Sequence, residues 1–314
     1  MDLREIIEES INRLPPSYDR TGIEAAVGHI KRAEKYWYTA KDSHDPEMFT
    51  DVIYRTNQAF EGSLKEAYFV LAEKASKKKN PFEIEQYLIE NKVLKPKLIE
   101  AVRNYRQEWR NTSTHDYKLF FSEHEALLAI ANVSTFSVML LDQIVVKVNE
   151  NLEKQRTVQL VDSIRASISD YDNLEFHTKV YSVLSRSYAS FYSLDSQITM
   201  TEYIGKLAGF LEAVIDDVTV HTDVGLAGNT GVNADLLVMS PNEDTVLIEV
   251  KQLAKEQQIT MRDSNYVLKL LELFDLKHGA LMVADSKSKT GGVSVQATIF
   301  DETPDIVSIV PTYD

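Results

Sequence analysis

Residues 234–251, ADLLVMSPNEDTVLIEVK, decide the fold of the C-terminal half of this 314-residue chain. Two apolar runs flank the turn-forming sequence Ser-Pro-Asn-Glu-Asp, which predicts two strands joined in a β-hairpin. If the hairpin is antiparallel and centred on Asn242, Asp235 lies opposite Glu249. Glu249 and Lys251 are two residues apart on one strand, so they share a face of the sheet with Asp235. The sequence therefore predicts two carboxylates and an ammonium group that converge on one face.

The carboxylate of Glu249 is out of place in an apolar core strand unless it has a function. Two facing carboxylates repel each other unless a cation lies between them, and Mg²⁺, or Mn²⁺ in its place, prefers oxygen ligands of this kind. A bound Mg²⁺ polarises a phosphoryl oxygen and lowers the pKa of a water nucleophile. An adjacent lysine such as Lys251 can position that water or stabilise developing negative charge. The alternative interpretation is an edge hairpin that carries a surface Glu–Lys pair.

The segments on either side of the hairpin predict a small α/β domain. We expect one helix over 201–216, before the hairpin, and another over 255–274, after it. Short apolar runs separated by turn residues predict further strands over 217–221, 279–284, 294–300 and 306–310. A helix, a run of strands, a helix and further strands describe a sheet covered by helices.

In this setting, Asp235 and the segment Glu249-Val250-Lys251 resemble the metal-binding motif of the PD-(D/E)xK, or restriction-endonuclease-like, nucleases. The resemblance covers about residues 196–314 and implies a central mixed sheet. It also implies that Asp235 and Glu249 ligate Mg²⁺, with the carbonyl of Val250 as a further ligand. Lys251 would then assist the attacking water.

Some members of this family add a glutamate from the helix that precedes the first strand. Glu212 matches that position best, and Glu202 is the rival candidate. The proline of the family name is absent, because Ala234 precedes Asp235, and many members vary there. The activity that the resemblance implies is cleavage of DNA or, less often, of RNA.

The first half of the chain predicts an all-α bundle, since its apolar residues recur at helical spacing. Helices are expected over 2–13, 22–40, 47–76, 96–108 and 126–153. Asn80 before Pro81 predicts a helix start, and Ser122 with Glu125 three residues later predicts a capping box. We therefore expect an α+β protein with a helical bundle over 1–157, connecting helices over 158–195 and the sheet domain over 196–314.

A second candidate site lies in the helical half, where residues 109–117 read WRNTSTHDY. His115 can move protons near neutral pH, and Arg110 can hold a phosphate with two parallel hydrogen bonds. Together they could activate a ribose 2′-hydroxyl without any metal. The alternative interpretation is structural, with Arg110 paired to a carboxylate such as Glu108 and His115 capping a helix.

A helical bundle that carries Arg-Asn-x-x-x-His after its penultimate long helix resembles a HEPN domain, over roughly residues 20–155. The resemblance implies a homodimer in which two copies of Arg110 and His115 form a metal-independent ribonuclease site. Tyr117 extends the motif to a form found in HEPN toxins whose tyrosine is modified by a partner nucleotidyltransferase. The same resemblance therefore implies such a partner as a regulator, with Tyr117 as its target.

Composition restricts the compartment and the mode of binding. The chain has no cysteine, which excludes disulfides and thiolate zinc sites, and no apolar run approaches the roughly 18 residues of a membrane span. Its charged N-terminal stretch is unlike a secretory signal, so a cytoplasmic protein without a membrane partner is expected. The net charge is −14, and residues 161–314 hold 23 acidic but only 11 basic side chains. This balance argues against a broad DNA-coating surface, although a metal site needs clustered carboxylates and the bound cation reverses the local field.

The sequence thus predicts a nuclease that hydrolyses nucleic acid, with DNA favoured over RNA, by Mg²⁺-dependent catalysis at Asp235, Glu249 and Lys251. One alternative is a metal-independent ribonuclease that uses Arg110 and His115. Another is a non-enzymatic dimeric protein that binds nucleic acid or acts as a scaffold. The pairing of two nucleic-acid-cutting units resembles prokaryotic antiphage and toxin proteins, which suggests that biological role by analogy.

Overall fold

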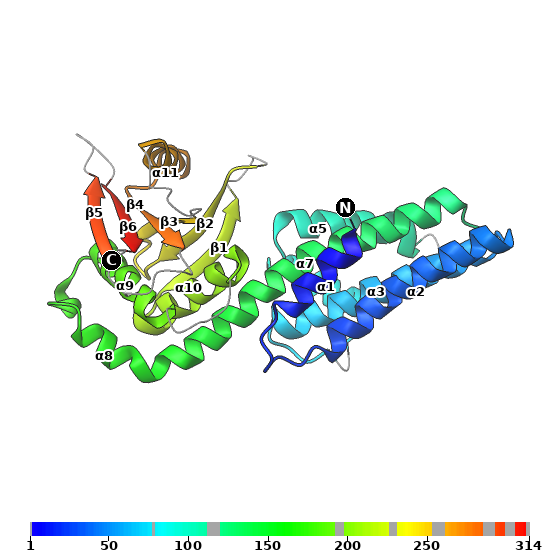
Figure 1. Ribbon diagram of the computed structural model, residues 1–314, viewed down its shortest axis with the longest axis horizontal. Coiled ribbons are helices and arrows are strands. Elements are labelled where there is room, and N and C mark those ends of the chain that lie inside the picture. The colour runs from blue at the N-terminus through cyan, green and yellow to red at the C-terminus, as the bar shows by residue number, and fades with distance from the viewer. Residues whose placement is uncertain are drawn as a thin grey trace. The chain divides into compact units, whose positions relative to one another are not determined.

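The computed structural model describes residues 2–76, 79–111, 120–191, 198–225, 231–252, 261–284, 293–298 and 305–311 (Figure 1). The chain forms two compact units, Met1–Val148 and Asn149–Asp314. The described residues of the first unit form helices joined by turns and loops, and the second unit contains a mixed sheet with helices. The predicted α+β class and the order of its two parts are therefore confirmed.

The helical unit is built around aromatic side chains. Its elements are α1 (Leu3–Asn12), α2 (Thr21–Ser43), α3 (Met48–Val70), α4 (Pro81–Glu90), α5 (Pro96–Tyr105), a π-helical segment (Arg106–Arg110) and the first part of α7 (Glu123–Thr157). Phe60 of α3 stacks on Tyr105 of α5 with ring centroids 4.5 Å apart, and it contacts Phe136 of α7 at 5.3 Å. All three side chains are buried, so three helices that are distant in sequence meet at one point of the core.

The helix ends follow local hydrogen bonding. The predicted helix start at Asn80 is confirmed, and there Glu83 completes a capping box that was not predicted. The predicted box of Ser122 with Glu125 is present at α7. Helix α3, however, ends at Val70 rather than at the predicted residue 76. Glu73 adopts a left-handed backbone conformation (φ 52°), and the N–H of Lys74 donates to the carbonyl of Tyr68. This backbone cap ends the helix without the glycine that usually marks such a position.

The boundary between the units falls inside α7, nine residues before the predicted boundary at 157. The last turns of α7 belong to the second unit because α10 packs closely against them. At Gly209 of α10 a side-chain Cβ would lie only 2.1 Å from the carbonyl oxygen of Glu150. Only glycine allows the two backbones to approach this closely.

Of the segment predicted as connecting helices, 158–195, the described residues 158–191 group with the second unit, and α9 contributes to its core. The segment contains α8 (Val161–Ala166) and α9 (Phe176–Phe191). The apolar face of α9, including Val180, Leu184 and Tyr188, is buried against the sheet. The reason for this difference is that α9 supplies one of the helices that the sheet needs to cover its face.

The second unit contains α10 (Met200–Val214), α11 (Met261–Phe274) and six strands: β1 (Thr219–Gly225), β2 (Asn233–Met239), β3 (Thr245–Gln252), β4 (His278–Ala284), β5 (Val293–Thr298) and β6 (Asp305–Pro311). The strand order in the sheet is β1-β2-β3-β4-β6-β5. Strands β1, β2 and β3 are antiparallel neighbours, β3, β4 and β6 run parallel, and β5 is antiparallel to β6. The expected mixed sheet is therefore confirmed.

Helices cover both faces of this sheet, with α9 and α10 on one side and α11 on the other (Figure 1). Along β3, Val246, Ile248 and Val250 belong to the core that includes α9 and α10. Leu247 belongs to the smaller core beneath α11. Glu249 and Lys251 follow Leu247 at alternate positions and therefore lie on the α11 side.

One helical stretch among the described residues, Glu123–Ala166, is long and apolar enough to cross a membrane by length and composition. Of its most apolar window, 61% is buried inside the protein. Burial of this kind is typical of the core helix of a soluble protein, where a helix that is hydrophobic all round packs against neighbours.

Candidate metal-binding and catalytic site

The β2–β3 hairpin has the register that the sequence predicts. Leu236 pairs with Ile248, so Asp235 and Glu249 face each other one position further along. The backbone N–H of Asp235 donates to Oε1 of Glu249 at 3.1 Å, and the N–H of Val250 donates to Oδ2 of Asp235 at 2.8 Å. Each carboxylate is therefore held by the backbone of the opposite strand, where the β2–β3 ladder ends.

Burial dominates the electrostatics of this pair. It raises the pKa of the Glu249 carboxyl to about 8, and the neighbouring charge of Asp235 contributes in the same direction. Burial also raises the pKa of Asp235, although the hydrogen bond from Val250 opposes this effect. Without a cation, the pair therefore holds a proton at neutral pH, and a metal ion would replace that proton.

The carbonyl of Val250 lies on the same side of β3 as Asp235. In an extended strand the N–H and the C=O of one residue point the same way, and the N–H of Val250 points at Asp235. The predicted set of two carboxylates and one backbone carbonyl is thus compatible with the backbone geometry.

Lys251 lies beside the pair, but its ammonium contacts a different residue. Its Nζ forms an ion pair and a hydrogen bond with Oδ1 of Asp263, in the first turn of α11. The Asp263 side chain is 15% exposed, so this ion pair is largely shielded from water. The sequence offered a weak signal for Asp263, an acidic residue near a helix N-terminus, which is common for reasons of helix stability alone.

Two further residues near the pair were not predicted. Asp223 occupies the β1 position opposite Asp235, has a left-handed backbone (φ 50°), and its charge raises the pKa of Asp235. Tyr266 of α11 has its own pKa raised by burial and then by the charges of Glu249 and Asp235, which places its hydroxyl near the pair. Sheet pairing and helix packing bring both side chains to the site, so sequence spacing could not indicate them.

The structure does not bring Glu212 to the pair. Oε2 of Glu212 accepts a hydrogen bond from Lys154 at 2.9 Å, and Oε1 accepts one from the N–H of Val220 at 3.4 Å. Val220 pairs with Val238, three residues or about 10 Å along β2 from Asp235. The rival residue Glu202 is also engaged elsewhere, because its carboxylate completes the N-terminal capping box of α10 with Thr199.

The described residues fit a divalent ion that keeps much of its own water. Within the parts of the chain that the structure describes, no three or more Asp, Glu or His side chains form a group that could hold a metal. Mg²⁺ is typically bound by one or two carboxylates, with waters and substrate phosphates as its other ligands. Among the described residues, no basic side chain bonds to the carboxylates of Asp235 and Glu249, and such a pair is the donor set for an ion of this kind.

The second predicted site is described only in part. Arg110 ends the π-helical segment and pairs with Glu61 of α3, with 3.4 Å between Nε and Oε1. This is the kind of carboxylate pairing that the structural interpretation predicts, with Glu61 in place of its example Glu108. His115 and Tyr117 lie outside the described residues. The structure therefore places one member of the Arg–His pair and leaves the pairing itself a prediction.

Comparisons of the chain with protein-family models, with curated proteins and with solved structures return no match. The geometry of the site is accordingly the basis for the function proposed below.

Proposed function

We propose that this protein is a nuclease that hydrolyses phosphodiester bonds of nucleic acid, with DNA the favoured substrate, in a reaction that depends on Mg²⁺ or Mn²⁺. The facing carboxylates of Asp235 and Glu249, part-buried at the end of the β2–β3 ladder, carry this proposal. Two acidic groups that repel each other in a poorly solvated place are costly for folding unless a cation or a proton offsets them. A function that requires a bound cation accounts for that cost.

Each residue of the site has a separate role in this proposal. Asp235, Glu249 and the carbonyl of Val250 hold the metal ion, which when bound polarises a phosphoryl oxygen and acidifies a water. Lys251 supplies a positive charge next to the reacting phosphate, where it stabilises developing negative charge. Asp263 holds the ammonium of Lys251 at the edge of the site in the absence of substrate.

The arrangement of elements around the pair is consistent with a restriction-endonuclease-like fold. Helix α10 precedes β1, the hairpin β2–β3 carries the motif, and α11 connects β3 to the parallel strand β4. The HEPN-like nature of the helical unit, dimerisation through it, a regulatory nucleotidyltransferase and a cytoplasmic antiphage role belong to the same proposal. Composition supports the cytoplasmic location, and the sequence resemblance supports the rest.

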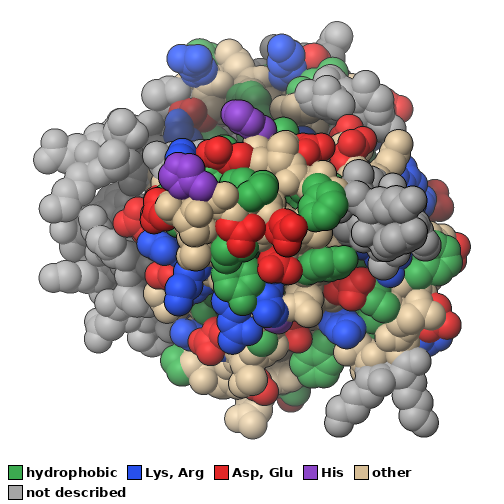
Figure 2. Space-filling model, turned by 90° about the vertical axis from the view of Figure 1, so that its right-hand side faces the viewer, with side chains coloured by type: hydrophobic (Ala, Val, Ile, Leu, Met, Phe, Trp, Pro, Cys, Tyr) green, Lys and Arg blue, Asp and Glu red, His purple; other side chains and the backbone are tan. Residues whose placement is uncertain are grey.

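Charge distribution bears on how nucleic acid would bind. The chain carries 48 acidic and 34 basic side chains, and on the face shown in Figure 2 the two signs are interspersed rather than gathered into a continuous basic surface. With a net charge of −14, we do not expect phosphate neutralisation over a wide area to be the main source of affinity. Affinity that depends on the metal at the scissile phosphate is expected instead.

A nuclease assay tests the proposal directly. Wild type, Asp235→Asn and Glu249→Gln are incubated with single- and double-stranded DNA and with RNA, with Mg²⁺, with Mn²⁺ and with EDTA. We expect metal-dependent cleavage by wild type and none by either variant, together with loss of Mg²⁺ binding measured by calorimetry. Asp244→Asn, which alters an exposed acid in the same hairpin turn, is the matched control and should retain both properties. Unchanged Mg²⁺ binding in both site variants would refute the assignment.

The metal-independent ribonuclease remains a second candidate because Arg110 lies in a π-helical segment, and such distortions of a helix often accompany functional sites. Cleavage of RNA that persists in EDTA and is lost in both Arg110→Ala and His115→Ala would favour it. Absence of cleavage under every condition, with nucleic-acid binding retained, would favour the non-enzymatic alternative.

A further inference from the structure

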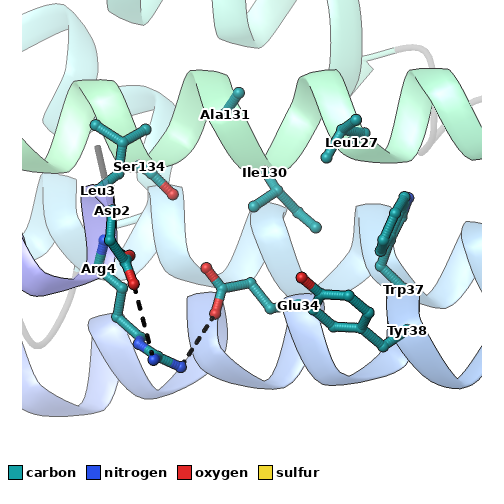
Figure 3. Close-up of a pocket in the computed structure, with 10 residues that line it drawn as sticks. All are labelled: Asp2, Leu3, Arg4, Glu34, Trp37, Tyr38, Leu127, Ile130, Ala131 and Ser134. Carbon is teal, nitrogen blue, oxygen red and sulfur yellow. Dashed lines mark hydrogen bonds and ion pairs between the residues drawn. The ribbon is translucent and has the colours of Figure 1, made fainter.

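The helical unit contains a cavity that the proposed nuclease site does not use (Figure 3). It lies between α1, α2 and α7 and has a volume of about 570 Å³. Sites for small organic ligands typically enclose about 300–1,000 Å³. The cavity is therefore large enough for a small organic ligand.

One part of the cavity is apolar and holds its aromatic rings in fixed orientations. Leu127 and Ile130 of α7 line it opposite Trp37 of α2. The indole N–H of Trp37 donates to the carbonyl of Glu123 at 3.1 Å. The adjacent Tyr38 ring meets Trp37 edge to face, with centroids 5.1 Å apart and an interplanar angle of 83°. Two rings at a right angle form a corner against which a hydrocarbon body can pack.

The other end of the cavity is charged, and acidic groups outnumber basic ones there. Asp2, Arg4 and Glu34 gather at this end in Figure 3, away from Trp37 and Leu127. The Arg4 guanidinium is shared between the two carboxylates, at 3.8 Å from Glu34 and 4.0 Å from Asp2. Both separations exceed a hydrogen-bond length, so one cation serves two anions without a close contact to either carboxylate.

Of the two carboxylates, Glu34 is the less exposed to water and therefore depends more on a hydrogen-bonding partner. Its side chain is 29% exposed, against 54% for Asp2. Burial raises the pKa of Glu34, and the opposing charges of Arg4 and Lys31 do not cancel this effect. No side chain or backbone group among the described residues donates a hydrogen bond to this carboxylate. A donor with a positive charge would supply what the half-buried oxygens lack.

We propose that this cavity binds a small organic amine, whose ammonium pairs with Glu34 and whose apolar body lies against Trp37, Leu127 and Ile130. An anionic ligand is disfavoured because Arg4 already serves two carboxylates. A neutral apolar ligand is disfavoured because it would bury Glu34 further without a partner. The amphipathic amine satisfies both ends of the cavity.

Tryptophan fluorescence provides a direct test, because the chain has only two tryptophans, Trp37 and Trp109. In Trp109→Phe the emission reports on Trp37 alone. Three probes of similar size are titrated: 2-phenylethylamine, 2-phenylethanol and 3-phenylpropionate. We expect a saturable change with the amine and binding at least about tenfold weaker for the alcohol and the carboxylate, as one charge-assisted hydrogen bond implies. Calorimetry on the unmodified chain repeats the comparison without the substitution.

Two cavity variants and one control complete the design. Glu34→Gln should weaken amine binding about tenfold and abolish the preference over the alcohol. Leu127→Lys places a competing ammonium in the cavity at a side chain that is 45% exposed and should also abolish amine binding. Glu24→Gln alters an exposed acid in the first turn of α2, outside the cavity lining, and should change nothing. Equal binding of the three probes, tighter binding of the carboxylate, absence of saturable amine binding, or an unaffected Glu34→Gln would overturn the proposal.

Discussion

Lys251 of β3 and Asp263 of α11 form an ion pair, so the only basic side chain of the predicted motif is bonded to a helix and not to the carboxylates beside it. Within the described ranges of the chain, the Asp235–Glu249 pair therefore has no bonded ammonium partner. The same contact ties the first turn of α11 to the strand that carries the motif. The position of the Lys251 ammonium therefore depends on the position of α11. Mutations at Lys251 and at Asp263 should not act independently.

The ion pair is testable by a double-mutant cycle on cleavage. Lys251→Met is expected to lower kcat by about 100-fold, the loss typical when one group that stabilises transition-state charge is removed. Asp263→Asn should lower kcat by about tenfold, because the ammonium is no longer held in place. Since Asp263 acts through Lys251, adding Asp263→Asn to Lys251→Met should cause no further loss.

Mg²⁺ affinity should be unchanged in all three variants of this cycle, because neither side chain bonds to the carboxylate pair. Asp275→Asn, an exposed acid just after α11, is the control and should leave kcat at the wild-type value. Additive losses in the double variant would show that Asp263 affects cleavage by another route.

The protonation of Glu249 makes a prediction about pH. Its pKa in the folded protein is about 8, above the 4.5 of an unperturbed carboxyl. Below pH 4.5 the Glu249 carboxyl is protonated in both the folded and the unfolded state, and its contribution to the free energy of unfolding is fully present. As the pH rises towards 8 the folded state retains the extra proton, so the free energy of unfolding falls by about 1.4 kcal/mol per pH unit from this group.

Urea denaturation in EDTA across this pH range measures the effect. Glu249→Gln has no carboxyl to ionise, so its stability should fall less steeply with pH than that of wild type. Added Mg²⁺ binds the ionised pair and should restore wild-type stability most strongly near pH 8. Parallel pH profiles for wild type and Glu249→Gln would show that this carboxyl is not shifted.

Much of the site was predictable because it is local. A turn sequence fixes the register of a hairpin, and alternation along each strand fixes the face, so the opposition of Asp235 and Glu249 follows from one short segment. Asp223, Asp263 and Tyr266 reach the site through strand pairing and helix packing. Nothing in their spacing marks them.

For the helices too, the sequence predicted local structure but not tertiary contacts. Periodicity identified α10, but it did not reveal that Glu212 points to Lys154, a residue 58 positions away in the sequence. The assignment of α8 and α9 as connecting helices failed because a helix that covers a sheet and one that joins two units have similar patterns. Helix existence is a local property, whereas helix partners are determined by tertiary packing.

Because α10 packs closely against α7 at Gly209, adding one methyl group at this position should lower the free energy of unfolding. Gly209→Ala would place a Cβ 2.1 Å from the backbone oxygen of Glu150, and backbone cannot yield as a flexible side chain does. Separation of α10 from the end of α7 should cost about 1–3 kcal/mol, as overpacking typically does. Gly28→Ala is the matched control, because a Cβ there meets nothing within 4 Å. Its effect should be a gain of up to about 1 kcal/mol from helix propensity. Chemical denaturation measures both, and equal effects would contradict the close contact.

Glu212 was predicted to be a third carboxylate ligand of the metal, whereas in the structure it pairs with Lys154. Substitutions at these two residues test the observed arrangement against the predicted one. Glu212→Gln removes the ion pair with Lys154, whose partner carboxylate is 15% exposed, so a loss of about 1 kcal/mol in stability is expected. Mg²⁺ affinity and kcat should stay at wild-type values, because Glu212 lies about 10 Å along the sheet from Asp235. Lys154→Met, which breaks the same ion pair from the other side, should reproduce the stability loss and serves as its control. If Glu212→Gln instead reduced Mg²⁺ affinity while Lys154→Met did not, the carboxylate would have to leave Lys154 and join the metal when the ion binds.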